Sequence, residues 1–201
     1  MASASQIQRL LAKPASFTPN FTSEHSVVLP HSLDTVFDKL GCGETLEASV
    51  RLSDLCSTFL LTTVDHVSLP EGQSLTEVRC RSLPPSDGSS NGALPRQFFE
   101  LQEVVPLLGG LYKHTVTIAG SLTSDREHKA ALYESSASGG ILIWKLRTFE
   151  ELAPDETGQV RTKVEEKIEG KAPMLLRSTV EKETRRAHTT HMEQYHTIFT
   201  T

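Results

Sequence analysis

The chain has 201 residues, enough for one domain with a sizeable core. Its 25 acidic and 20 basic residues give a formal charge of −5, which argues against a surface that binds nucleic acid by neutralising phosphates. No apolar run approaches the roughly 20 residues that cross a bilayer. The three separated cysteines predict neither a disulfide framework nor a CxxC metal or redox site. We therefore expect a cytoplasmic protein of a reducing compartment, without a cofactor.

The first 20 residues are predicted to form a flexible N-terminal extension. Arg9 and Lys13 lie among Ser and Ala residues, and no acid precedes Glu24. A mitochondrial transit segment has this character, and a frayed or helical extension is the alternative. Residues 21–201 are then expected to form a single domain.

The next part of the chain predicts a strand followed by two short helices. Residues 21–29 end in an apolar run that favours a strand. Residues 33–40 place apolar side chains at helical spacing behind a Ser32 cap, and Gly41 ends this helix. A second short helix is predicted over residues 44–51.

Residues 55–69 are rich in β-branched and apolar side chains and predict a strand. A weaker strand is predicted over residues 75–81. The segment 83–95 is rich in Gly, Pro and Ser, so we interpret it as a mobile loop within the domain.

The following part of the chain predicts an antiparallel meander, because short turns rich in glycine separate its strands. The five predicted strands are residues 98–105, 113–122, 129–136, 141–149 and 160–170. On the last strand, charged residues at odd positions must face water. The even positions, which face inward, are Thr162, Val164, Glu166, Ile168 and Gly170. The same alternation assigns His114 to the inner face of residues 113–122, and Leu142, Trp144 and Leu146 to that of residues 141–149.

Residues 173–199 predict one long amphipathic helix, because apolar residues recur every three or four positions. Such a helix reaches roughly 40 Å. A one-sided helix of this length needs a broad apolar surface. The sequence therefore predicts an α+β fold in which a curved antiparallel sheet of six to seven strands wraps around the C-terminal helix, with one face in water.

This order of elements resembles the helix-grip architecture of the START-like (SRPBCC) superfamily. Several stretches resemble a largely fungal branch of it: FELQEVVPLLGGLYKH at 99–114, LYES at 132–135, WKLR at 144–147, and IEGKAP at 168–173 leading to Ala187-His188 and His191-Met192. The resemblance implies a hollow between sheet and helix that takes an apolar ligand such as a lipid, sterol, polyketide or terpenoid. Some members of the superfamily bind or carry ligands, and others cyclise or condense them.

Glu166 and His114 are the candidates for proton transfer. A buried, unpaired carboxylate is costly, and burial raises its pKa toward the range used in acid–base catalysis. The alternative is that Glu166 lies near the cavity mouth or pairs with a neighbour. His114 is otherwise a structural histidine at the start of its strand. Nothing in the sequence shows that the two side chains meet.

Further residues are predicted to line the ligand cavity, although ordinary core packing explains them equally well: Tyr133, Trp144, Val164, Ala187, His191, Met192 and Tyr195. His188, His191 and His196 invite a metal hypothesis, but their spacing offers neither an HExxH pattern nor a third ligand, so no metal site is predicted.

These features predict binding of a small hydrophobic ligand in a cavity of roughly 300–1,000 Å³ under the C-terminal helix. The first alternative is a non-redox cyclase, isomerase or lyase of secondary metabolism in which Glu166 and His114 transfer protons. The second is a protein-interaction module that uses a strand edge or the 83–95 loop. Motifs for a nucleophilic serine, a phosphate loop or a dinucleotide are absent from the sequence.

Overall fold

The computed structural model describes residues 4–11, 17–88, 92–107 and 112–200. Seven antiparallel strands form one sheet in the order β1-β7-β6-β5-β4-β3-β2. Their bounds are β1 Phe21–Leu29, β2 Cys56–Val67, β3 Leu94–Leu107, β4 Tyr112–Asp125, β5 Ala130–Ala137, β6 Ile141–Leu152 and β7 Arg161–Lys171. Consecutive strands from β2 to β7 pair directly, whereas β1 pairs with β7. The predicted antiparallel sheet is confirmed, with β1 and β2 as its edge strands.

Two short helices cross one face of the sheet between β1 and β2. The helix α2 (Leu33–Leu40) begins at Ser32, whose hydroxyl accepts a hydrogen bond from the Thr35 amide. A 3-10 turn, η1 (Gly43–Thr45), leads into α3 (Leu46–Val50). Apolar side chains of both helices enter the main core beside the inner residues of β3, β4 and β7, so the predicted pair of helices is confirmed.

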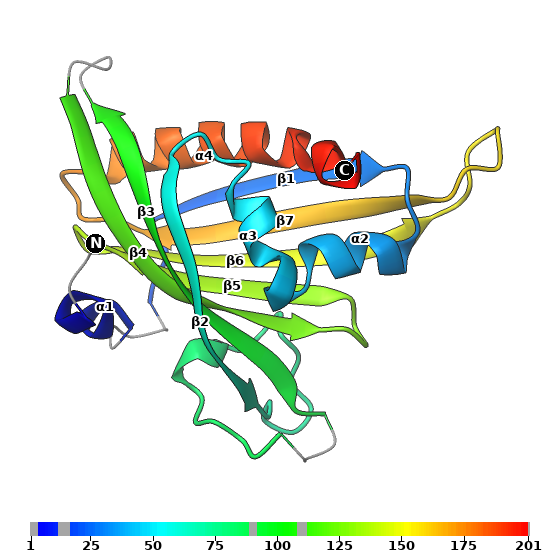
Figure 1. Cartoon of the computed structure of the whole chain (residues 1–201), viewed down its shortest axis with the longest axis horizontal. Helices are drawn as coiled ribbons and strands as arrows, with labels where there is room; N and C mark the ends of the chain where they lie inside the picture. Colours follow the sequence, from blue (N-terminus) through cyan, green and yellow to red (C-terminus); the bar gives the residue numbers. More distant parts are fainter. Residues whose placement is uncertain (1–3, 12–16, 89–91, 108–111, 201) are drawn as a thin grey trace.

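The C-terminal helix α4 (Arg177–Glu193) runs along β1 on the same side as α2 and α3 (Figure 1), and its His188 reaches Glu166 of β7. It is shorter than the predicted helix over residues 173–199. Residues 173–176 form a turn, and the chain after Gln194 tightens into the 3-10 helix η4 (Tyr195–Phe199) through i→i+3 hydrogen bonds. His188 and Met192 form the buried stripe of α4, whereas Ala187 and His191 are half-buried at its edge.

The opposite face of the sheet is also partly covered, which differs from the predicted wet face. The segment between β2 and β3 packs Leu75, Val78 and Cys80 against this face. Trp144 lies in the same cluster, so its predicted position on the inner face is wrong. The same correction applies to Leu146, which shares that cluster, and to Leu142, which lies two residues before Trp144 and therefore on the same face of β6. The pattern misled because both faces of β6 are buried and hydrophobicity alone does not distinguish them.

An N-terminal helix, α1 (Ala4–Leu11), extends this cover. Its Ile7 and Leu10 are buried against Ala119 of β4. This helix agrees with the alternative of a helical extension, and two apolar side chains on one of its faces dock it on the sheet.

Arg96 of β3 anchors the segment between β2 and β3. Its guanidinium group donates to Asp65 at 2.8 and 2.6 Å and to the carbonyl oxygens of Cys80 and Leu83 at 2.5 and 3.1 Å. The strand predicted over residues 75–81 is wrong, since the segment forms turns and a 3-10 helix, η2 (Cys80–Ser82). Within the described part of the chain, no helix is long and apolar enough to cross a membrane.

Candidate functional site

Glu166 is the centre of a buried polar cluster between β7, β6 and the C-terminal helices. Its side chain is inaccessible to solvent. Oε1 accepts hydrogen bonds from Arg147 Nε and, at 2.5 Å, from the Tyr195 hydroxyl. Oε2 lies 3.2 Å from His188 Nε2 and 3.4 Å from Lys145 Nζ. Four donors around one carboxyl group favour its ionised form.

The pKa of Glu166 shifts in the direction opposite to the expected one. Burial raises it, but the charges of Arg147 and Lys145 and the hydrogen bond from His188 outweigh burial and hold it well below 4.5. The carboxylate therefore stays ionised at neutral pH, and Glu166 does not have the raised pKa expected of a general acid.

Arg147 connects this cluster to the rest of the fold. It donates to Glu166, to the backbone carbonyl of Leu40 at the end of α2, and to the Tyr195 hydroxyl at 2.6 Å. His188 extends the network to β1, because its Nδ1 lies 2.9 Å from the Ser23 hydroxyl. A neutral imidazole that donates from Nε2 and accepts at Nδ1 satisfies both contacts. The cluster thus joins α2, α4 and η4 to the sheet, which agrees with the alternative in which Glu166 pairs with its neighbours.

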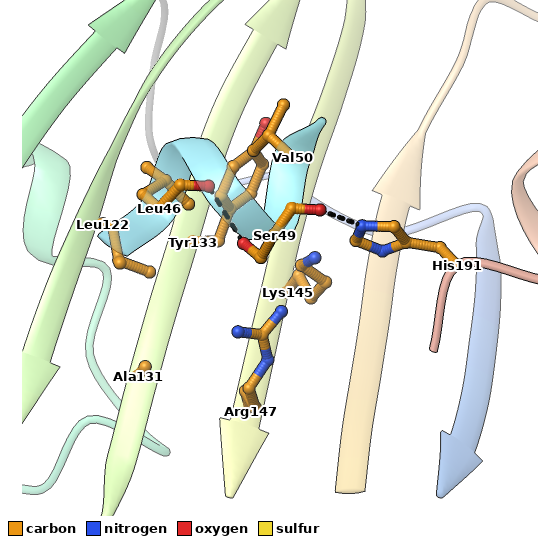
Figure 2. A pocket seen from close by; sticks show the side chains of 9 residues that line it. All are labelled: Leu46, Ser49, Val50, Leu122, Ala131, Tyr133, Lys145, Arg147 and His191. Atoms are coloured by element: carbon orange, nitrogen blue, oxygen red, sulfur yellow. Dashed lines mark hydrogen bonds between the residues drawn. The ribbon is translucent and has the colours of Figure 1, made fainter. Parts of the chain in front are cut away.

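Lys145 lies two residues before Arg147 on the same face of β6. Its side chain is 15% exposed, and its ammonium lies 5.0 Å from the centre of the Tyr133 ring. Burial lowers the pKa of Lys145, although the Glu166 charge opposes this effect. Lys145 and Arg147 point from the sheet toward a cavity beneath α3 (Figure 2).

That cavity has a volume of about 20 Å³, room for one water molecule. Its apolar lining comes from α3 and the sheet, namely Leu46, Val50, Leu122 and Ala131. Tyr133, Lys145, Arg147, Ser49 and His191 complete it. The space is far smaller than the predicted 300–1,000 Å³, because the side chains of the Glu166 cluster and of α3 fill the region under the helices.

His191 closes this cavity on the α4 side. Its Nε2 lies 2.5 Å from the carbonyl oxygen of Ser49 in α3, as Figure 2 shows. A carbonyl oxygen accepts only, so Nε2 carries the proton and Nδ1 holds a lone pair in the neutral ring. Burial, assisted by the Lys145 charge, lowers the pKa of His191 to about 4. The imidazole is therefore neutral at pH 7, and its hydrogen bond links α4 to α3.

A larger groove of about 430 Å³ lies beside η1, between α2 and the ends of β2, β3 and β4. Phe37, Val64 and Leu122 contribute apolar surface to it, and Gln97 and Arg126 contribute polar groups. Leu122 lines both the groove and the small cavity.

One row of paired residues connects these two spaces across the sheet. Val64, Gln97, Leu122, Tyr133 and Lys145 are consecutive cross-strand partners from β2 to β6. Neighbouring strands lie about 4.8 Å apart, so Leu122 and Lys145 are separated by roughly 10 Å. Between the two spaces, η1 lies against the row: a Cβ on Gly43 would meet the Gln97 Cβ at 2.6 Å.

The structure does not bring His114 to Glu166. His114 is exposed near the start of β4, opposite Val105. Cross-strand pairing leads from Glu166 through β6 and β5 to Ser124 of β4. Ser124 is ten residues after His114 on that strand. At about 3.3 Å per residue the separation along the strand is roughly 30 Å. His114 has the alternation expected of the inner face, but this end of the strand lies outside the core. A proton-transfer pair of Glu166 and His114 is therefore wrong.

The other predicted cavity residues occupy three different environments. Tyr133 and His191 line the small cavity. Val164, Met192 and Tyr195 are fully buried in the main core, and Ala187 is half-buried on α4. Trp144 lies on the opposite face of the sheet.

The three histidines of the C-terminal region have different surroundings. His188 belongs to the Glu166 cluster, His191 bonds to Ser49, and His196 is exposed with Nδ1 at 2.7 Å from the Glu193 carbonyl. Among the described residues, no group of three or more His, Cys, Asp or Glu side chains has an arrangement that could hold a metal ion.

The sequence interpretation missed Lys145 and Arg147, the two cations at the cavity. It assigned the apolar residues of 141–149 to the inner face and hence these charged residues to water. A usable signal was present, since the basic Lys145 and Arg147 alternate with the large apolar Trp144 and Leu146 on a strand next to the inward Glu166. A buried carboxylate needs such partners.

Comparison with known proteins identifies the fold. Neither family models nor curated protein sequences gave a match. Among solved structures, the chain is similar to the crystal structure of the Zhui aromatase/cyclase from Streptomyces sp. R1128. The TM-score is 0.53 at 11% identity, over 87% of this chain and 90% of that one. At this identity the similarity concerns architecture alone. Together with the curved antiparallel sheet and the C-terminal helix, it shows that this chain has a helix-grip fold.

Proposed function

We propose that the chain binds a small, largely apolar molecule along the row of residues from Val64 to Lys145. The observation that carries this proposal is the shared position of Leu122, which lines both the 430 Å³ groove and the 20 Å³ cavity. The groove has the volume of a typical ligand site, which is about 300–1,000 Å³. The cavity adds the buried cations Lys145 and Arg147, beside apolar residues that include Leu122.

Ligand entry into the cavity requires η1 and α3 to move away from the sheet. The contacts that hold them include the burial of Leu46 in the main core, the packing of Gly43 on Gln97, and the hydrogen bond from His191 to Ser49. α3 has only 5 residues, of which Leu46 and Ser49 are buried, and short elements of this kind open at lower free energy than core strands and commonly serve as lids. We therefore propose that η1 and α3 form the lid of this site.

Binding can be tested with the neutral fluorescent probe N-phenyl-1-naphthylamine. Val64 is 58% exposed in the groove, whereas Val160 is 45% exposed in the β6–β7 connection. The Val64→Trp variant should weaken probe binding about tenfold or more by filling the groove, and the matched Val160→Trp variant should bind as the wild type does. Probe binding that is absent from the wild type, or equal in both variants, would contradict the site.

A second candidate function is a non-redox cyclase, isomerase or lyase. Two observations favour it: the fold similarity to an aromatase/cyclase, and the presence of Lys145 and His191 at one cavity. Lys145 can donate a hydrogen bond to a carbonyl oxygen while His191 Nδ1 accepts a proton from the adjacent carbon, which is enolisation, the first step of an aldol closure. These two residues replace Glu166 and His114 in the proposal.

Enolisation can be measured as deuterium exchange at the α-carbon of benzoylacetone, an apolar β-diketone. The cyclase candidate predicts exchange above the buffer rate that is lost in both Lys145→Met and His191→Ala. Exchange equal to that in buffer would leave binding as the proposed function. The interaction-module alternative stays a prediction, for which the exposed Leu60 and Val64 on edge strand β2 are the relevant surface.

A further inference from the structure

The buried cluster around Glu166 contains more positive than negative charge. Arg147 and Lys145 both form ion pairs with Glu166, and no other carboxylate of the described residues pairs with either of them. His188 lies between Ser23 and Glu166 and adds no negative charge. One carboxylate thus faces two cations in a region where charge is costly unless it is paired.

Lys145 carries the excess charge, because Arg147 has the better partners. All three donor nitrogens of Arg147 have acceptors, in Glu166, Leu40 and Tyr195. Lys145 lies 3.4 Å from a carboxylate oxygen that also accepts from His188, and its other described contact is the face of the Tyr133 ring. An ammonium group has three donors. Lys145 also lines the cavity, where Leu46, Val50, Leu122 and Ala131 offer its ammonium group no acceptor.

The other titratable groups around the cavity do not remove this excess. His191, with a pKa of about 4, is neutral at pH 7. Burial raises the pKa of the Tyr133 phenol and of the Cys56 thiol, which keeps both neutral. Glu103 of β3 is half-buried, and burial raises its pKa while the Lys145 charge lowers it. Glu103 is thus the internal competitor for Lys145.

We propose, as an extension of the proposed function on which it rests, that the ligands of this site are small apolar anions. The oxyanion, a carboxylate or a phenolate, pairs with Lys145 Nζ, and the apolar body lies toward Leu122 and the groove. A ligand anion restores the charge balance that the protein leaves incomplete. A neutral molecule of the same shape leaves the lysine with only the Glu166 oxygen that it shares with His188, so the site discriminates by charge and not by shape alone.

A matched pair of probes tests this inference: 2-naphthoate and 2-naphthamide, which share a shape and differ in charge. Isothermal titration of the full chain should give at least about tenfold tighter binding of the anion, the worth of one charge-assisted hydrogen bond. The Lys145→Met variant, checked for folding by circular dichroism, should lose this preference. The Glu103→Gln variant should bind naphthoate more tightly than the wild type, because it removes a competing carboxyl group.

Equal affinity of the wild type for both probes would overturn the inference, as would a preference for the anion that survives in Lys145→Met. Binding of N-phenyl-1-naphthylamine distinguishes loss of the charge preference from loss of the binding site. If that neutral probe binds and the naphthalene pair binds equally, the charge preference fails and the site stands. If none of the three probes binds, the proposed function fails as well.

Discussion

The hydroxyl of Tyr195 lies 2.5 Å from Oε1 of Glu166, so the last helical turn of the chain is joined directly to its last strand. Both side chains are fully buried. The same hydroxyl accepts a hydrogen bond from Arg147, which places it between a cation and an anion. This contact fixes η4 beneath the sheet edge and explains why Glu166 has a structural role.

The Tyr195→Phe variant should be less stable than the wild type by about 1–3 kcal/mol, because it removes two buried hydrogen bonds to charged groups and leaves the ring in place. Urea denaturation monitored by circular dichroism gives this difference. His196→Ala is the matched control, since His196 is the exposed neighbour, and it should change stability by less than about 0.5 kcal/mol. Equal stability of Tyr195→Phe and the wild type would show that the hydrogen bonds of the Tyr195 hydroxyl do not stabilise the fold.

Replacing Glu166 with Leu should destabilise the fold by about 3–5 kcal/mol, because Arg147 and Lys145 then become unpaired buried cations. The double variant Glu166→Leu with Arg147→Met should recover part of this loss, since one of the two cations is removed with the carboxylate. Urea denaturation of both proteins tests the coupling. A double variant that is less stable than the single one would show that the cost does not come from the unpaired charge.

Acid titration gives a second readout of Glu166. Its folded pKa is lowered, so its contribution to stability is present above the unfolded value near 4.5 and is lost as the pH falls through the folded pKa. The wild type should therefore lose stability below about pH 4.5 more steeply than Glu166→Gln. Parallel acid profiles of the two proteins would be inconsistent with a paired carboxylate.

Glu134 has the opposite pH dependence. It is buried on the other face of the sheet, where Oε2 accepts from the Arg81 amide at 2.6 Å. Burial, opposed by this bond and by nearby arginines, raises its pKa from 4.5 to about 7. Its contribution to folding stability is therefore fully present below the unfolded pKa of 4.5 and is lost as the pH rises toward 7. The loss in the free energy of unfolding is on the order of 2–3 kcal/mol.

The Glu134→Gln variant replaces this carboxyl with an amide, which does not titrate. Between pH 5 and pH 8 the wild type should lose more stability than this variant does, as measured by chemical denaturation at the two pH values. Equal losses in the two proteins would show that Glu134 titrates alike in the folded and unfolded chain.

Replacing His191 with Ala should speed ligand uptake. The change removes the hydrogen bond that joins α4 to Ser49 of α3 and enlarges the cavity beneath the proposed lid. Stopped-flow mixing with N-phenyl-1-naphthylamine should show a faster association rate, with His196→Ala unchanged. A slower or unaltered rate in His191→Ala would argue against lid movement at α3.

Much of the fold could be predicted from local patterns, because periodicity and turn residues report directly on secondary structure. The strand Phe21–Leu29 and the helix Leu33–Leu40 have the predicted bounds. The alternation on β7 correctly placed Glu166 inside. These features depend on a few neighbouring residues, which a single sequence contains.

The site was harder to predict, because it depends on which face of β6 turns inward. The two sets of alternate residues on β6 are both buried or half-buried, so apolar character alone favours Trp144 over Lys145 as the inward residue. The packing of the segment after β2 determines which face of β6 turns inward, because this segment covers Trp144 on the opposite face. Likewise, the position of His114 along β4 depends on strand register, which no local pattern fixes.

We expect a bound ligand to lie along the row of residues that connects the groove to Lys145. Heteronuclear NMR of the full chain during titration with N-phenyl-1-naphthylamine tests it most directly. We expect saturable shifts centred on Val64, Leu122 and Val50, with a change at the Lys145 side chain. Saturable shifts confined to other parts of the sheet, or no saturable shifts at all, would show that no ligand binds along the row from Val64 to Lys145.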